Sequence, residues 1–179
     1  MKFLSVPLIV FLFAFLTSEG QVKPSNYSLS QRRSKFPFSA STKVRIGSFW
    51  IKEHQEAGNE MSIPKKSQTN EVDIERFEEI LILTRQQVDT LSDILYNTYN
   101  RVADQRLSLM RCYEPRNAIL FYDRNDTLIA YIEICFECYR LRTSSEKVFL
   151  EKMCDKTYRG IQDFFLKHGI KTSIYDIPD

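Results

Sequence analysis

Two β-rich runs that flank a short polar turn constrain the fold of this chain more than any other feature. Residues 117–123 and 126–135 are rich in apolar and aromatic side chains and flank Arg124-Asn125, a pattern typical of a β-hairpin. The register expected for this loop pairs Phe121 with Leu128, Leu120 with Ile129, Ile119 with Ala130, and Arg116 with Glu133 at the rim. Because both faces of the hairpin are apolar, we expect it at the centre of a sheet that is covered on both sides.

An amphipathic helix is predicted on each side of this hairpin. Residues 84–87, Thr-Arg-Gln-Gln, form a capping box, and the apolar residues that follow recur on one helical face, which predicts a helix over 85–102. Residues 155–168 show a similar spacing, and Gly169 stands where a residue in the left-handed conformation often ends a helix.

The rest of the chain carries weaker signals. Residues 43–51 favour a strand, residues 59–70 a loop, and residues 73–83 fit either a helix or a short buried strand at their end. The order of strand, helix, hairpin and helix predicts a small single α+β domain over 43–179, in which a central antiparallel β-hairpin or sheet is packed by two or three helices.

The N-terminus has the composition of an export signal. Lys2 precedes an almost unbroken apolar run, and small residues occupy positions 18 and 20, which predicts a signal peptide over 1–20. The run is shorter than the about 20 apolar residues of a membrane span, and no second hydrophobic stretch is long enough to span a bilayer. We therefore expect an exported protein, periplasmic or extracellular.

The segment after the signal is predicted to be a flexible leader. Residues 21–42 are rich in serine, contain two prolines and show neither helix nor strand periodicity. The basic cluster Arg32-Arg33-Ser34-Lys35 within it either stays solvated or contacts an acidic surface.

Composition and motifs exclude several classes of function. The net charge is only +2, so nothing favours nucleic-acid binding. The 5 glycines form no phosphate-binding loop, and neither a nucleophile elbow nor a His-Glu-x-x-His motif is present. His54 lies in a polar stretch, and His168 closes a predicted helix, where an imidazolium interacts favourably with the helix dipole. A catalytic role is not expected.

The four cysteines are the unusual chemical feature. The predicted register places Cys112 beside the segment that contains Cys135 and Cys138, and Cys154 precedes the last helix. An even number of cysteines in an exported chain favours disulfides. Cys112 can pair with either Cys138 or Cys135, and the remaining sulfur of that pair with Cys154. One disulfide with a free pair is the other arrangement that fits.

Two further hypotheses use the same sulfurs. A zinc site would need all four cysteines, Cys112, Cys135, Cys138 and Cys154, as tetrahedral ligands, and zinc is the one cofactor that the residues suggest. A thioredoxin-like site would use Cys135 and Cys138, yet no apolar helical spacing follows them and no suitable proline lies downstream.

Several segments together resemble a known group of proteins. They are residues 112–123, residues 132–138, Asp163-Phe164-Phe165 and Gly169-Ile170. They resemble exported, uncharacterised bacterial proteins that are commonest among Bacteroidota, over roughly residues 80–172, with Ile-Cys-Phe-Glu-Cys at 134–138 as the most distinctive part. That group often has His at the position of Asn117, so one further ligand or base is missing here. The resemblance implies export and a bacterial source, but no activity.

The leading hypothesis is an exported, non-catalytic binding or structural module whose cysteines stabilise the fold, with a protein as one class of partner. The first alternative is a zinc- or thiol-dependent enzyme or redox protein that uses Cys135 and Cys138. The second is an envelope protein of the immunity type, which neutralises a toxin.

Overall fold

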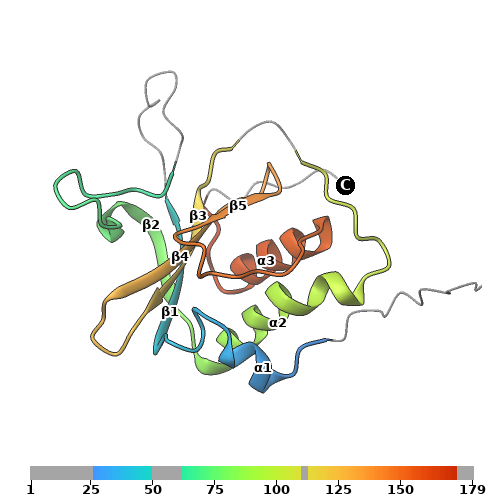
Figure 1. The fold of residues 1–179 in the computed structure, drawn as a ribbon. Helices are drawn as coiled ribbons and strands as arrows, with labels where there is room; N and C mark the ends of the chain where they lie inside the picture. Colours follow the sequence, from blue (N-terminus) through green and yellow to red (C-terminus); the bar gives the residue numbers. More distant parts are fainter. Residues whose placement is uncertain (1–25, 50–61, 110–112, 173–179) are drawn as a thin grey trace, which may run out of the picture.

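The computed structural model describes residues 26–49, 62–109 and 113–172, which form one antiparallel sheet and three α-helices (Figure 1). The strands are β1 Lys43–Phe49, β2 Phe77–Ile82, β3 Asn117–Tyr122, β4 Leu128–Cys135 and β5 Arg140–Thr143. The helices are α1 Leu29–Ser34, α2 Arg85–Arg101 and α3 Asp155–Lys167, with a 3₁₀ turn, η1, at Ile74–Arg76. The strand order is β2-β1-β3-β4-β5, so the fold is α+β and the hairpin β3–β4 is central, as predicted.

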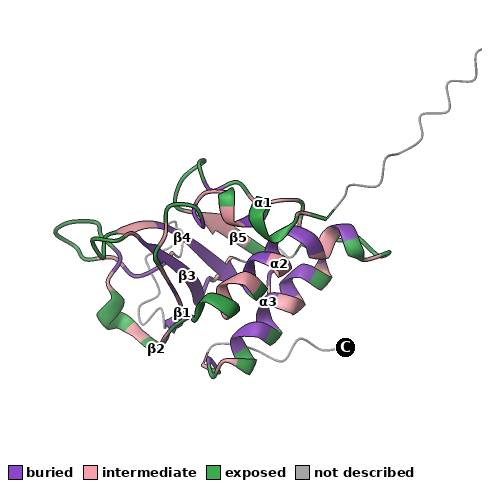
Figure 2. Ribbon diagram, turned by 90° about the horizontal axis from the view of Figure 1, so that it is seen from below, coloured by how far each residue is buried: buried purple, intermediate pink, exposed green. Residues whose placement is uncertain are grey.

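The three helices cover one face of the sheet (Figure 1). Side chains of α2 and α3 pack with every second residue of the strands into the main core. Figure 2 shows this as buried residues on β3, β4 and the inner sides of α2 and α3. Within the described ranges, no helix is long and apolar enough to span a membrane.

The second face of the sheet carries a smaller apolar cluster, and no α-helix of the described ranges packs on it. Strand residues such as Phe49 and Leu120 meet Ile63 and Val72 there, which belong to the segment between β1 and β2. The segment 62–76 therefore acts as the cover of this face, and it forms one wall of the cavity considered below.

Both helix predictions are confirmed. Thr84 Oγ1 accepts a hydrogen bond from Gln87 N at 3.3 Å, and Gln87 Oε1 accepts one from Thr84 N at 2.7 Å, which is the reciprocal pattern of a capping box. At the end of α3, Gly169 has a φ of +89°, the left-handed conformation that favours glycine.

The predicted hairpin register is wrong by two residues. Phe121 lies opposite Ala130, Leu120 opposite Tyr131 and Ala118 opposite Glu133, with an irregularity between Phe121 and Tyr122. The loop is longer than predicted because the Asp123 carboxylate accepts the N–H groups of Asn125 and Thr127. Since side chains alternate with a period of two, a shift of two keeps residues on their predicted faces. The irregularity changes this at two positions, because Leu128 lies on the face of Leu120 and Ile129 on the face of Phe121, opposite to the prediction.

One consequence of the shift concerns Glu133. The predicted pairing of Arg116 with Glu133 is wrong. The Arg116 guanidinium instead donates a hydrogen bond to the Glu114 carboxylate at 3.0 Å. The residue opposite Glu133 on the other side is Arg142 in β5, a strand for which the sequence gives no clear signal.

The prediction of a flexible leader over 21–42 is wrong from Asn26 onwards. Ser28 caps α1, and Arg32 is buried against α2, where its guanidinium bonds to Ser92 Oγ at 3.2 Å and pairs with Asp93 at 3.0 Å. The basic cluster thus contacts acidic residues of α2, which are remote in sequence. Residues 1–25, with the predicted signal peptide, lie outside the described ranges.

The ambiguous segment 73–83 contains both kinds of structure. Asp73 caps the short turn η1, and β2 follows directly and pairs with β1. The predicted strand over 43–51 is confirmed as far as Phe49, and its last two positions lie outside the described residues.

Candidate functional site

The cysteines lie in and beside the turn after β4. Cys135 ends the strand, Cys138 is completely buried in the following turn, and Cys154 is the N-cap residue of α3. Cys135 and Cys154 carry free thiols, so the structure does not join Cys154 to Cys135. Cys112 lies outside the described residues.

The Cys135 thiol is poorly suited to nucleophilic or redox chemistry. It is 2% exposed, and burial raises its pKa although the backbone N–H groups of Glu114 and Cys138 oppose the shift. It ends a strand, whereas reactive thiols are commonly activated at a helix N-terminus. Among the described residues, no group of three or more His, Cys, Asp or Glu side chains is arranged to hold a metal ion.

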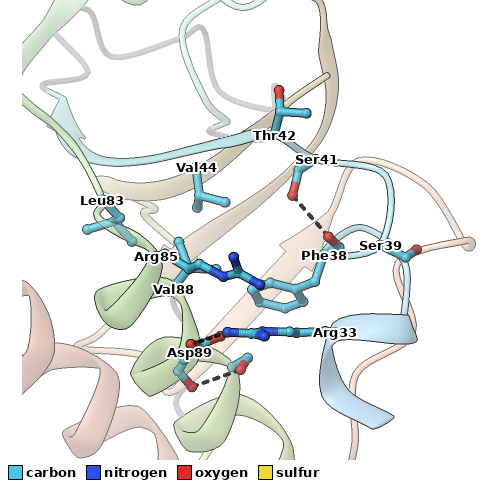
Figure 3. A pocket seen from close by; sticks show the side chains of 11 residues that line it. Arg33, Phe38, Ser39, Ser41, Thr42, Val44, Leu83, Arg85, Val88 and Asp89 are labelled. Atoms are coloured by element: carbon cyan, nitrogen blue, oxygen red, sulfur yellow. Dashed lines mark hydrogen bonds and ion pairs between the residues drawn. The ribbon is translucent and has the colours of Figure 1, made fainter. Parts of the chain in front are cut away.

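A first pocket, of about 340 Å³, lies between α1, β1 and α2 (Figure 3). Phe38, Val44, Leu83 and Val88 supply its apolar walls. The Arg33 side chain reaches it from α1 and Arg85 from α2 (Figure 3). The pocket is therefore lined by apolar side chains together with two arginines and the Asp89 carboxylate.

The charges of this first pocket serve mainly to attach α1. Arg33 donates two hydrogen bonds to the Asp89 carboxylate, at 2.9 and 2.6 Å, a bidentate pairing that neutralises both groups. Arg85 is exposed to solvent, where an arginine needs no protein partner. The first pocket thus shows no buried group that lacks a partner.

A second cavity, of about 490 Å³, lies on the face of the sheet that has no helices. We call it the sheet cavity: segment 65–74 forms one wall, and residues 126–131 with Tyr122 form the other. Val72, Leu128 and Tyr131 give it an apolar lining. Its volume lies within the range of small-molecule sites.

Two neighbouring polar groups beside the sheet cavity are buried without a partner. Tyr122 is 6% exposed, and its hydroxyl makes no hydrogen bond with any described residue. The Arg45 Nε is likewise buried without an acceptor, and its guanidinium carbon lies 4.8 Å from the centre of the Tyr122 ring. Buried polar groups normally have hydrogen-bond partners, so this pair is the strongest sign of a ligand in the described part of the molecule.

The Tyr122 hydroxyl is a hydrogen-bond donor at neutral pH. Burial raises the pKa of Tyr122, and the positive charge of Arg45 opposes this shift only in part. The phenol therefore stays protonated. Tyr122 offers its O–H and Arg45 its Nε–H as hydrogen-bond donors.

Among the charged residues that line the sheet cavity, two lysines and Glu71 make no ion pair with a described residue. Asp126 pairs with Lys43 beneath Tyr122, and the Glu71 carboxylate accepts the Thr69 hydroxyl at 3.2 Å. Lys65 and Lys66 line the wall, and neither forms an ion pair with another residue of the described ranges.

Glu133 holds the wall that carries these lysines. Its carboxylate is 4% exposed and accepts the Ile63 N–H at 2.8 Å and the Tyr113 hydroxyl at 2.9 Å. Burial and the charge of Glu133 raise the pKa of Tyr113, and Arg142 stacks on the Tyr113 ring at 4.0 Å. A single buried carboxylate thus joins two loops to the centre of the sheet.

Sequence reasoning missed the sheet cavity. Tyr122 stands in a β-rich run where an aromatic residue is expected for packing alone. The one usable signal was Arg45, a charged residue between Val44 and Ile46 in a predicted strand. Its significance depends on β1 being an inner strand, which only the tertiary structure shows.

The chain was compared with protein families, curated proteins and solved structures. No protein-family model, no curated protein and no solved structure matches the chain. The functional argument therefore rests on the geometry of the sheet cavity.

Proposed function

We propose that the protein is an exported, non-catalytic binding module that holds a small ligand in the sheet cavity. The observation that carries this proposal is the pair of buried, unmatched donors at Tyr122 and Arg45 beside a cavity of about 490 Å³. An unsatisfied buried polar group costs about 1–3 kcal/mol. A ligand that supplies an acceptor removes this cost, and binding is favoured by the same amount.

The cysteines in this proposal stabilise the fold. With Cys135 and Cys154 free, we assign a disulfide between Cys138 and Cys112. Arg116 N donates a hydrogen bond to Ile134 O at 3.3 Å, so the chain that leads into β3 runs beside the end of β4, directly before the turn that contains Cys138. A bridge there would close the open end of the hairpin, and disulfides typically stabilise by about 2–4 kcal/mol.

Export is part of the same proposal. It is supported by the basic start, the apolar run and the small residues over 1–20, the features that a signal peptidase recognises. An oxidising compartment outside the cytoplasm would also favour the proposed disulfide.

The proposal is tested by a fragment screen with ¹⁹F NMR. Fluorinated fragments are added to the mature protein and to Thr127→Trp, which places a bulky side chain at the rim of the sheet cavity. Thr127 takes part in its turn through its backbone, since its N–H donates to the Asp123 carboxylate and its C=O accepts from Asp123 N, so the variant should fold. Gln86→Trp, on the exposed side of α2, is the matched control.

We expect fragments that bind the wild type and Gln86→Trp but not Thr127→Trp. If no fragment distinguishes the two variants, the sheet cavity is not the binding site and the proposal fails.

A further inference from the structure

The sheet cavity also indicates which chemical class of ligand it takes, an inference that rests on the function proposed above. From the groups that meet there, we propose that the ligand is a small organic carboxylate, with the carboxylate at Tyr122 and an apolar body against Val72, Leu128 and Tyr131.

The two buried polar groups beside the sheet cavity that lack a described partner are both hydrogen-bond donors. Tyr122 O–H and Arg45 Nε–H both donate hydrogen bonds, and both are buried without an acceptor. An ammonium ligand could donate to the phenolic oxygen of Tyr122, but it would leave the Arg45 Nε–H without an acceptor and would add a second positive charge beside it. A carboxylate has only acceptor atoms, and hydrogen bonds to charged groups are about twice as strong as those between neutral ones.

The sign of the surrounding charge also favours an anionic ligand. Lys43 and Arg45 lie against the Tyr122 ring, with Lys43 neutralised by Asp126. Arg45 makes no ion pair with any described residue, and neither does Lys65 or Lys66. Glu71 is the one carboxylate of the lining that makes no ion pair with a described residue either. Three unpaired positive charges therefore stand against one negative charge around the cavity, and an anion gains Coulomb energy there.

The apolar lining favours an organic anion. A bare inorganic anion would occupy only the polar end, because Val72, Leu128 and Tyr131 line much of the remaining cavity. Desolvating this apolar surface favours a ligand that has a hydrocarbon or aromatic body. The complementary molecule is therefore amphiphilic, with one anionic end.

The experiment compares three probes of nearly equal shape and different charge. They are 4-fluorobenzoate, which is anionic, 4-fluorobenzamide, which is neutral, and 4-fluorobenzylamine, which is cationic. Each is titrated by ¹⁹F NMR against the mature wild type, Tyr122→Phe, and the control Tyr99→Phe, whose tyrosine lies on α2 away from the cavity.

We expect the benzoate to bind at least about tenfold more tightly than the benzamide, as one hydrogen bond to a charged group predicts, and the benzylamine not to bind. Tyr122→Phe should lower the benzoate affinity about tenfold and the benzamide affinity by a smaller factor, because the amide oxygen is a neutral and weaker acceptor. Tyr99→Phe should behave as the wild type.

Replacing both Lys65 and Lys66 by Gln should lower the benzoate affinity and reduce its dependence on salt. The exposed Lys152, replaced by Gln, serves as the control for a lost surface charge.

Equal affinity for benzoate and benzamide would overturn the carboxylate assignment while leaving the sheet cavity as a binding site. Benzoate affinity that survives Tyr122→Phe unchanged would overturn the role of the phenol. Failure of the proposed function gives a different result: no probe or fragment then binds the wild type more tightly than it binds Thr127→Trp.

Discussion

At the scale of single residues, Glu133 connects stability to the sheet cavity. Its buried carboxylate accepts the Ile63 N–H and the Tyr113 O–H, and the segment beginning at Ile63 carries the cavity wall. We expect Glu133→Ala to lower the free energy of unfolding by about 2 kcal/mol or more, because two buried donors lose their acceptor. Urea unfolding followed by circular dichroism measures this.

Glu133→Gln should cost less, since one amide oxygen can still accept a hydrogen bond. The exposed Glu78 on β2 provides the control, and Glu78→Ala should change stability by no more than about 0.5 kcal/mol. Equal effects of Glu133→Ala and Glu78→Ala would show that Glu133 does not hold the wall.

Gly47 is a second residue whose role is set by its neighbours. A Cβ added there would lie 2.6 Å from the Glu79 carbonyl oxygen and 2.7 Å from Phe77 Cδ1. Because the first of these is a backbone atom, β1 or β2 would have to move. We expect Gly47→Ala to destabilise by about 2 kcal/mol, the range for overpacking, as measured by thermal or urea unfolding.

Gly160 in α3 is the matched comparison. A Cβ there would meet only Ile94 Cγ2, at 3.2 Å, and alanine favours a helix over glycine by about 1 kcal/mol. Gly160→Ala should therefore leave stability unchanged or raise it slightly. If both alanine variants behaved alike, close approach of β1 and β2 would not explain Gly47.

At the scale of elements, Glu79 joins β2 to β1 and to the chain after α3. Its Oε2 accepts hydrogen bonds from Ser48 Oγ at 2.9 Å and from Lys171 N and Thr172 N at 2.8 Å each. Burial would raise the pKa of Glu79, but these hydrogen bonds outweigh burial and lower it below the usual value. The anchor is therefore a charged carboxylate at neutral pH.

This depressed pKa predicts a pH dependence. A carboxyl group with a lower pKa in the folded state stabilises the protein above its unfolded pKa, near pH 4, and this contribution is lost as the pH falls through the folded pKa. We expect Glu79→Gln to be less stable than the wild type at pH 7, with the difference shrinking below about pH 4. Urea unfolding at a series of pH values tests this, and a difference that does not change with pH would contradict it.

The elements also show where local sequence signals suffice. The capping box at Thr84 and Gln87 and the glycine after α3 are contained within a few residues, and both predictions hold. The hairpin register depends on the Asp123 side chain, which accepts two backbone N–H groups and lengthens the loop. The leader prediction failed because the partners of Arg32 and Arg33 lie on α2, about 60 residues away in sequence.

At the scale of the whole molecule, the oxidation state of the four cysteines tests the proposed disulfide between Cys112 and Cys138. We expect the intact mass of the mature protein, purified without reductant, to show one disulfide and no bound zinc. The two remaining thiols, Cys135 and Cys154, are buried and should react with iodoacetamide only after denaturation. Digestion should recover Cys112 linked to Cys138.

Two disulfides would contradict this assignment, and four free thiols with zinc in the native spectrum would restore the metal hypothesis. Cys135→Ser provides the matched variant, because it removes a free thiol and should keep the disulfide, whereas Cys138→Ser should abolish it.

The sequence by itself determined the faces of the hairpin except at Leu128 and Ile129, the two long helices and the α+β class, because each depends on hydrophobic periodicity or on caps within one element. Only the tertiary structure decided that β1 lies inside the sheet, that α1 docks on α2, and that Tyr122 lines one cavity with Lys65 while Arg45 lies against its ring. Those contacts join residues far apart in the chain, and their energy depends on burial and on neighbouring charges, which have no local signature in a single sequence.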